Sequence, residues 1–162
     1  MRRAVATVLA VMMTTVFLAA QAKPNFAGTW TLDETKSTIP QMGGGPGGGR
    51  GGGAARSITV KQTDAELNRE SQMGERTMTR VYKLDGSETV NSTPRGDTKS
   101  KSHWEGATLV TESTSEMQGP SGSVTIVSKE TMSLDAEGNL VIETNAKTPM
   151  GDRTTKLVYK KG

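Results

Sequence analysis

The stretch Phe26-Ala27-Gly28-Thr29-Trp30-Thr31-Leu32-Asp33 stands at the head of a long series of short segments in which apolar and polar residues alternate. In an extended chain, Trp30 and Leu32 fall on one face and the intervening polar residues on the other. A Gly two residues before a Trp at this point is typical of a small β-barrel whose Trp closes one end. We therefore expect structural roles for Trp30 and for Gly28, which lets the backbone bend into the barrel wall.

The alternation recurs along the chain and predicts about ten short strands. Asp85-Gly86 and the turn at 136–139 favour tight connections between antiparallel neighbours, and no segment after residue 22 has helical periodicity. The fold class predicted is all-β, an antiparallel up-and-down β-barrel or strongly curled sheet. The expected strands span residues 27–33, 57–62, 66–72, 75–84, 88–92, 97–105, 108–117, 123–134, 140–146 and 154–160.

The first 22 residues have the pattern of an export signal and precede this barrel domain, which is expected to span 23–162. Met1-Arg2-Arg3 is basic, the residues up to Ala20 are uncharged, and Ala20-Gln21-Ala22 is a small-x-small cleavage site. We expect a helical signal peptide cleaved after Ala22 and a periplasmic or secreted product that contacts a membrane only through this segment before cleavage. An uncleaved anchor is the alternative.

A Gly-rich insert at 41–55 follows the first strand and is expected to be a flexible tether. The alternative is an Arg-Gly element that contacts nucleic acid or an anionic polymer. The chain has 20 basic and 17 acidic residues, and removal of Arg2 and Arg3 with the signal leaves 18 basic residues. A nearly neutral chain does not favour a nucleic-acid partner.

Residues for catalysis or metal binding are scarce. The sequence has no Cys, and its one His, His103, lies in the row Lys99, Lys101, His103 and Glu105 that we expect to face solvent. Zinc sites need several Cys or His ligands, and a nucleophilic triad needs a His oriented beside a Ser and a carboxylate. We predict no enzyme activity, no metal and no cofactor. Composition also favours a barrel, because hydrophobic residues amount to only 33 % of the chain and a curled sheet needs one apolar face.

Three segments resemble calycins, the group of lipocalins and fatty-acid-binding proteins. Residues 26–32 resemble their opening strand, Trp104-Glu105-Gly106 a late hairpin of the fatty-acid-binding branch, and residues 154–160 its closing strand. The resemblance implies a barrel that holds a small ligand. In that branch an Arg two positions before the terminal Tyr anchors the ligand's carboxylate. Tyr159 matches that Tyr, but Leu157 stands at the Arg position.

These observations predict a non-catalytic, monomeric barrel that binds a small amphipathic or hydrophobic ligand. Arg80 shares a strand face with Met78 and Tyr82 and is the nearest substitute for the missing anchor, unless a register slip turns it outward. Trp104 is either a core residue or a ligand-stacking one. The alternative function is an interaction protein of the cell envelope with a filled barrel. The ligand-binding residues predicted are Arg80, Tyr82, Trp104 and Tyr159.

Overall fold

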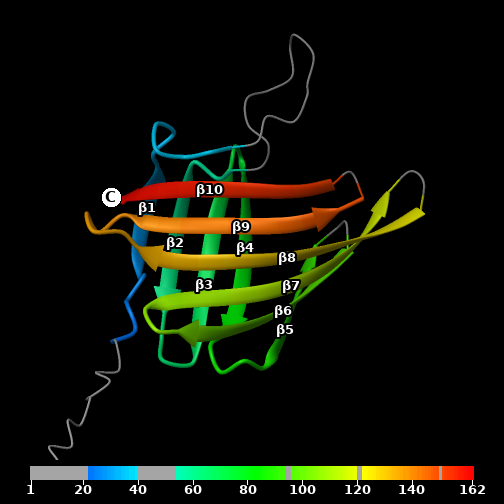
Figure 1. Ribbon diagram of the computed structural model, residues 1–162, viewed down its shortest axis with the longest axis horizontal. Helices are drawn as coiled ribbons and strands as arrows, with labels where there is room; N and C mark the ends of the chain where they lie inside the picture. The colour runs from blue at the N-terminus through cyan, green and yellow to red at the C-terminus, as the bar shows by residue number, and fades with distance from the viewer. Residues whose placement is uncertain (1–21, 40–53, 94–95, 120–121, 150) are drawn as a thin grey trace, which may run out of the picture.

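Ten antiparallel strands in the described part of the chain form one curled sheet (Figure 1). The computed structural model describes residues 22–39, 54–93, 96–119, 122–149 and 151–162. The strands are β1 (Gly28–Leu32), β2 (Ser57–Gln62), β3 (Glu66–Met73), β4 (Arg76–Lys83), β5 (Glu88–Thr93), β6 (Gly96–Glu105), β7 (Thr108–Gly119), β8 (Gly122–Leu134), β9 (Leu140–Thr148) and β10 (Gly151–Lys161).

The all-β fold class and the antiparallel barrel are confirmed, and each predicted segment coincides with one of these strands. The largest difference is β10, which begins at Gly151 rather than at 154. Residues 1–21 and 40–53, which hold most of the predicted signal and insert, lie outside the described residues. Ala55, at the end of the predicted insert, is buried in the core. No described residue belongs to a helix long and apolar enough to cross a membrane.

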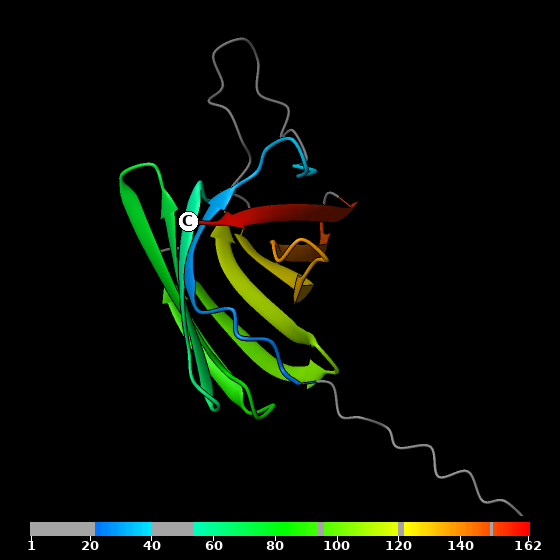
Figure 2. The same ribbon diagram turned by 90° about the vertical axis from the view of Figure 1, so that its left-hand side faces the viewer.

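Because β1 pairs with β10 as well as with β2, the first and last strands are neighbours in one continuous sheet, whose end strands are β4 and β5. Figures 1 and 2 show two layers, with β1 to β4 crossing behind β6 to β10. We call the end with the β2–β3, β4–β5, β6–β7 and β8–β9 turns the base, and the opposite end the mouth. The lead-in before β1, dark blue in Figure 2, passes along the base.

Trp30 lies at the centre of the apolar packing that fills the base. Its side chain is 1 % exposed, and its indole N–H donates a hydrogen bond to the Phe26 carbonyl oxygen at 2.8 Å. Gly28 has φ +140°, and a Cβ there would lie 3.3 Å from Cε of Lys161, whose amine is 5.6 Å from the centre of the Trp30 ring. A side chain at position 28 would therefore strain the backbone and press on the lysine that covers Trp30. The rest of the hydrophobic core comprises Phe26, Ala55, Ile58, Val60, Leu67, Tyr82, Leu84, Leu109, Met132, Leu140, Ile142 and Tyr159.

A short segment after β1, residues 33–38, lies along the edge of β10, and we call it the strap. In it, Thr38 forms an antiparallel β-bridge with Lys156. The Ser37 hydroxyl accepts a hydrogen bond from the Val158 N–H at 2.9 Å. The strap is needed because β1 has 5 residues and β10 has 11, which leaves part of the β10 edge without a strand partner.

The two ends of the sheet, β4 and β5, meet along a seam that side chains bridge. No ladder joins these two strands. Instead, the Asn91 side-chain amide accepts a hydrogen bond from the Val81 N–H and donates one to the Val81 carbonyl, both at 2.9 Å. The Thr89 hydroxyl accepts a hydrogen bond from the Lys83 N–H at 3.1 Å. The Asn91 amide thus takes the place of a backbone peptide group.

Replacement of Asn91 by Ala is expected to lower the free energy of unfolding by about 1–3 kcal/mol, because both polar groups of the Val81 backbone lose their partner in a partly buried position. The measurement is urea denaturation followed by Trp fluorescence. Asn145→Ala on the exposed face of β9 is the control, since that side chain accepts one hydrogen bond, from the Thr154 hydroxyl. Equal losses for the two variants would show that the seam does not depend on Asn91.

Candidate functional site

The interior of the barrel contains a cavity above the packed base. It has a volume of about 290 Å³ and opens toward the mouth. Its apolar walls come from both layers, with Ile58 on β2, Ile142 on β9 and Leu157 on β10. Two methionines, Met73 and Met78, line it at the mouth ends of β3 and β4. The remaining lining residues are Ala54, Ala55, Arg69, Ser71, Arg80, Glu130, Thr144, Thr155 and Tyr159.

A buried ion pair crosses the interior from one layer to the other. Arg69 on β3 donates hydrogen bonds to both carboxylate oxygens of Glu130 on β8, at 2.8 and 3.3 Å. The same guanidinium donates a hydrogen bond to the Tyr82 hydroxyl at 2.9 Å. Burial lowers the pKa of Arg69, but the charge and hydrogen bonds of Glu130 together with the phenols of Tyr82 and Tyr159 outweigh it, and the net pKa is raised. Arg69 therefore carries its charge with most of its donors satisfied.

Arg80 lies directly across the β3–β4 ladder from Arg69 and lines the same cavity. It faces the interior, one of the two orientations that the sequence left open, and it is partly exposed. Like charges on directly opposed residues repel. Glu130 neutralises Arg69, whereas no carboxylate within the described residues forms an ion pair with Arg80. Arg80 is therefore the cation that the cavity offers.

The two tyrosines among the predicted ligand-binding residues lie close to this cluster. Tyr159 lines the cavity, and its hydroxyl donates a hydrogen bond to the Ala55 carbonyl at 3.1 Å. Tyr82 is 4 % exposed beneath Arg69. Burial raises the pKa of Tyr82, although Arg69 opposes it. Burial likewise raises the pKa of Tyr159 to about 12. Both phenols stay neutral at physiological pH.

Trp104 lies apart from the other three predicted residues. Its ring stacks on that of Phe26 at the base, with ring centres 5.6 Å apart, and it packs against the core. It is not among the residues that line the cavity. The structure thus brings Arg80, Tyr82 and Tyr159 together and leaves Trp104 in the base packing.

Sequence reasoning did not identify Arg69 and Glu130. The signal was present in the alternation, because Arg69 lies two residues after the buried Leu67, and Glu130 two residues before the buried Met132. Charged residues in such strands are normally assigned to the solvent face. Only their partners across the barrel make the inward orientation favourable.

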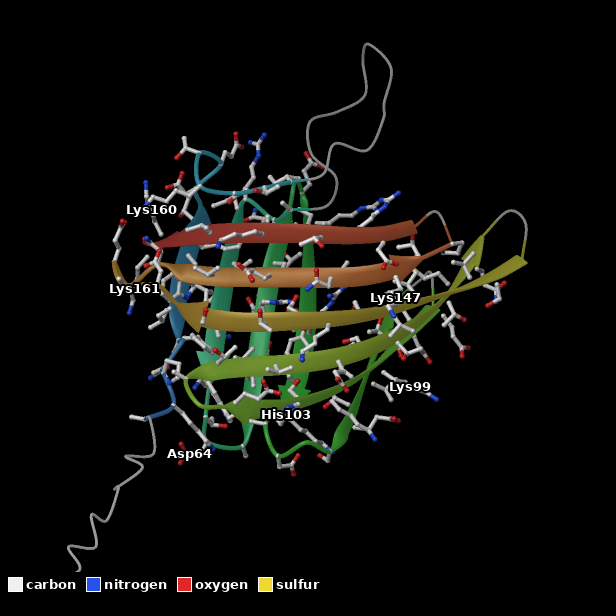
Figure 3. The ribbon with its side chains drawn as sticks, viewed as in Figure 1. Asp64, Lys99, His103, Lys147, Lys160 and Lys161 are labelled. Atoms are coloured by element: carbon white, nitrogen blue, oxygen red, sulfur yellow. The ribbon has the colours of Figure 1, made fainter. Side chains whose placement is uncertain are left out.

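The outer face of β5 to β10 carries a larger hollow of about 830 Å³. Lys99 and Lys147, which line it, project from the outer surface in Figure 3. Charges of opposite sign alternate there, with Glu112 opposite Lys101 on one side and Lys129 on the other. Cross-strand pairs of this kind stabilise a sheet surface and favour neither sign of ligand charge. We therefore assign the site to the interior.

No group of three or more His, Cys, Asp or Glu side chains among the described residues could hold a metal ion. His103 is 46 % exposed on the outer face of β6, where Figure 3 labels it, and its ring nitrogen lies 3.0 Å from the Glu105 carboxylate.

Comparison with known proteins finds solved structures that share this barrel fold. A zebrafish ileal bile acid-binding protein complexed with cholic acid superimposes with a TM-score of 0.55 at 14 % identity, covering 85 % of this chain and 98 % of that one. REP1-NXSQ, a fatty acid transporter, superimposes with a TM-score of 0.54 at 12 % identity, covering 84 % and 95 %. The searches against protein-family models and against curated protein sequences found no match. At such identities the likeness shows the fold.

The chain has two tyrosines, so alkaline titration of absorbance at 295 nm should show little tyrosinate in the folded protein at pH 10. The unfolded chain loses phenolic protons near pH 10, whereas folded Tyr159 keeps its proton to about pH 12. The unfolded state then binds fewer protons, so the free energy of unfolding falls by about 1.4 kcal/mol per pH unit for this group between these values.

Tyr159→Phe provides the control for this titration, because the variant should lose the part of the alkaline destabilisation that Tyr159 causes. A native absorbance step with its midpoint at pH 10 would contradict the burial of both phenols.

Proposed function

We propose that this barrel is a non-catalytic binding protein for a small amphipathic ligand that enters by the mouth with its anionic head first. The observation that carries the proposal is the cavity itself, which combines apolar walls with a cation, Arg80, that no described carboxylate neutralises. Arg80 is partly buried, and a cation in such a position without a counter-ion is costly unless it stays hydrated or meets an anion. An anionic head group satisfies it.

The cavity dimensions limit the ligand to a small molecule. Ligand pockets range from about 300 to 1,000 Å³, and the 290 Å³ here is close to the lower end. The base is filled by the protein's own side chains, so the head lies beside Arg80 and Tyr159. The apolar part lies along Leu157 and leaves between Met73 and Met78. Methionine side chains adapt readily to different apolar shapes.

The two similar barrels add support, since one holds cholic acid and the other is described as a fatty acid transporter. Both ligands combine a carboxylate with an apolar body. We propose a ligand of the same general character for this chain, held by Arg80 on β4 because Leu157 occupies the anchor position expected on the closing strand.

The proposal includes export of the mature domain to the periplasm or the extracellular medium, which rests on the sequence of residues 1–22. The competing function is an interaction protein of the cell envelope whose interior serves only for stability. Mass spectrometry of organic extracts from the mature protein, purified gently from its source, separates the two. A stoichiometric anionic amphiphile supports the carrier function, whereas a clean extract without dye binding supports the interaction protein.

Arg80→Gln is expected to lower the affinity of the barrel for the anionic dye 1-anilinonaphthalene-8-sulfonate by about 10–100-fold. The affinity for dodecanoate, measured by displacement of the dye, should fall by a similar factor. The loss corresponds to one hydrogen-bonded charge contact of roughly 1.5–3 kcal/mol. Fluorescence titration measures both effects. Lys83→Gln is the matched control, since it removes a cation from the exposed face of the same strand. Equal affinities for the two variants would place the anion elsewhere.

A further inference from the structure

Glu130 is a carboxylate inside a cavity proposed to bind anions. Its two carboxylate oxygens accept hydrogen bonds from the two terminal nitrogens of the Arg69 guanidinium. We propose that Glu130 is a built-in counter-anion that sets the charge of the ligand head, so that the barrel selects amphiphiles with one negative charge over those with two. This inference rests on the proposed function and names the ligand class within it.

The charge balance of the cavity follows from its lining. Among the lining residues, only Arg69, Arg80 and Glu130 carry charge, and two positive charges less one negative charge leave +1. The nearby phenol of Tyr159 is neutral and contributes hydrogen-bonding capacity alone. A monoanionic head brings this interior to neutrality, whereas a dianionic head leaves an excess negative charge.

The charge balance of the cavity affects ligand binding because Glu130 lies in a largely buried position. The carboxylate side chain is 17 % exposed and the Arg69 side chain 7 %, so solvent screens the cluster weakly and charge mismatches are costly. Glu130 reaches Arg69 from the opposite layer, and the pair lies between the apolar base and the cavity. An incoming head therefore meets Arg69 already neutralised and Arg80 unneutralised.

A purely structural ion pair would stabilise the barrel without affecting ligand choice. The two roles differ in what happens when Glu130 loses its charge. Under the structural role, the preference between ligands of different head charge stays constant. Under the selective role, the cavity charge rises to +2 and the preference moves to the dianion.

The test compares dodecanoate with dodecyl phosphate, two probes that share one alkyl chain. At pH 8 the phosphate ester is mainly doubly charged because its second pKa is about 6. Isothermal titration calorimetry on the mature chain should show dodecanoate binding about tenfold tighter than dodecyl phosphate. Glu130→Gln should reverse that order. Arg69→Gln combined with Glu130→Gln keeps the balance at +1 through Arg80 and should retain the original order.

Glu143→Gln is the matched control, since this carboxylate pairs with Lys156 on the exposed face of β9 and its loss should leave the order unchanged. If Glu130→Gln does not fold, Thr155→Lys adds a positive charge to the lining without touching the ion pair and should also favour the dianion. An unchanged order in the folded variant overturns the role of Glu130 while ligand binding stands. Failure of the wild-type chain to bind either probe or the dye overturns the proposed function and the inference together.

Discussion

The packing around Trp30 is the interaction on which the remaining structure depends. A chain with few large apolar side chains can fill only part of a barrel, and here the filled part is the base, where Phe26, Trp30 and Tyr159 are each at most 1 % exposed. Because these side chains are packed together, the strands are held in register and the sheet curls until its end strands, β4 and β5, meet at the seam. The space above the packed base remains as the cavity.

Hydrogen bonds between polar side chains hold the parts of the barrel wall that the apolar core does not reach. Three consecutive hydroxyl pairs line the inner face of β6 and β7, at Ser102–Thr111, Ser100–Ser113 and Thr98–Ser115, with distances of 2.8, 3.1 and 2.9 Å. The Asn91 amide bridges the seam between β4 and β5. Each of these hydrogen-bonding arrangements satisfies a polar group whose partner would otherwise be water.

The agreement between sequence and structure differs from element to element. The strands could be predicted because alternation and turn residues are local signals. The side of the barrel wall on which Arg80 lies was left open, because the face it shares with Met78 and Tyr82 turns inward or outward with the strand register. The position of Trp104 could not be predicted, because an aromatic residue on an inner face packs at the base or lines a cavity according to what lies opposite. Its partner, Phe26, comes from the lead-in, 78 positions earlier in the numbering.

The sequence by itself determined an all-β barrel, its strand order along the chain, the Trp that closes one end and the absence of cysteine chemistry, since all of these depend on neighbouring residues or on composition. Only the tertiary structure decided which charges lie inside. Arg69 and Glu130 are separated by 61 positions, and neither would be stable in the interior alone. Their burial becomes favourable only when curling of the sheet brings β3 and β8 face to face, because two buried charges must meet in good geometry to offset the loss of hydration.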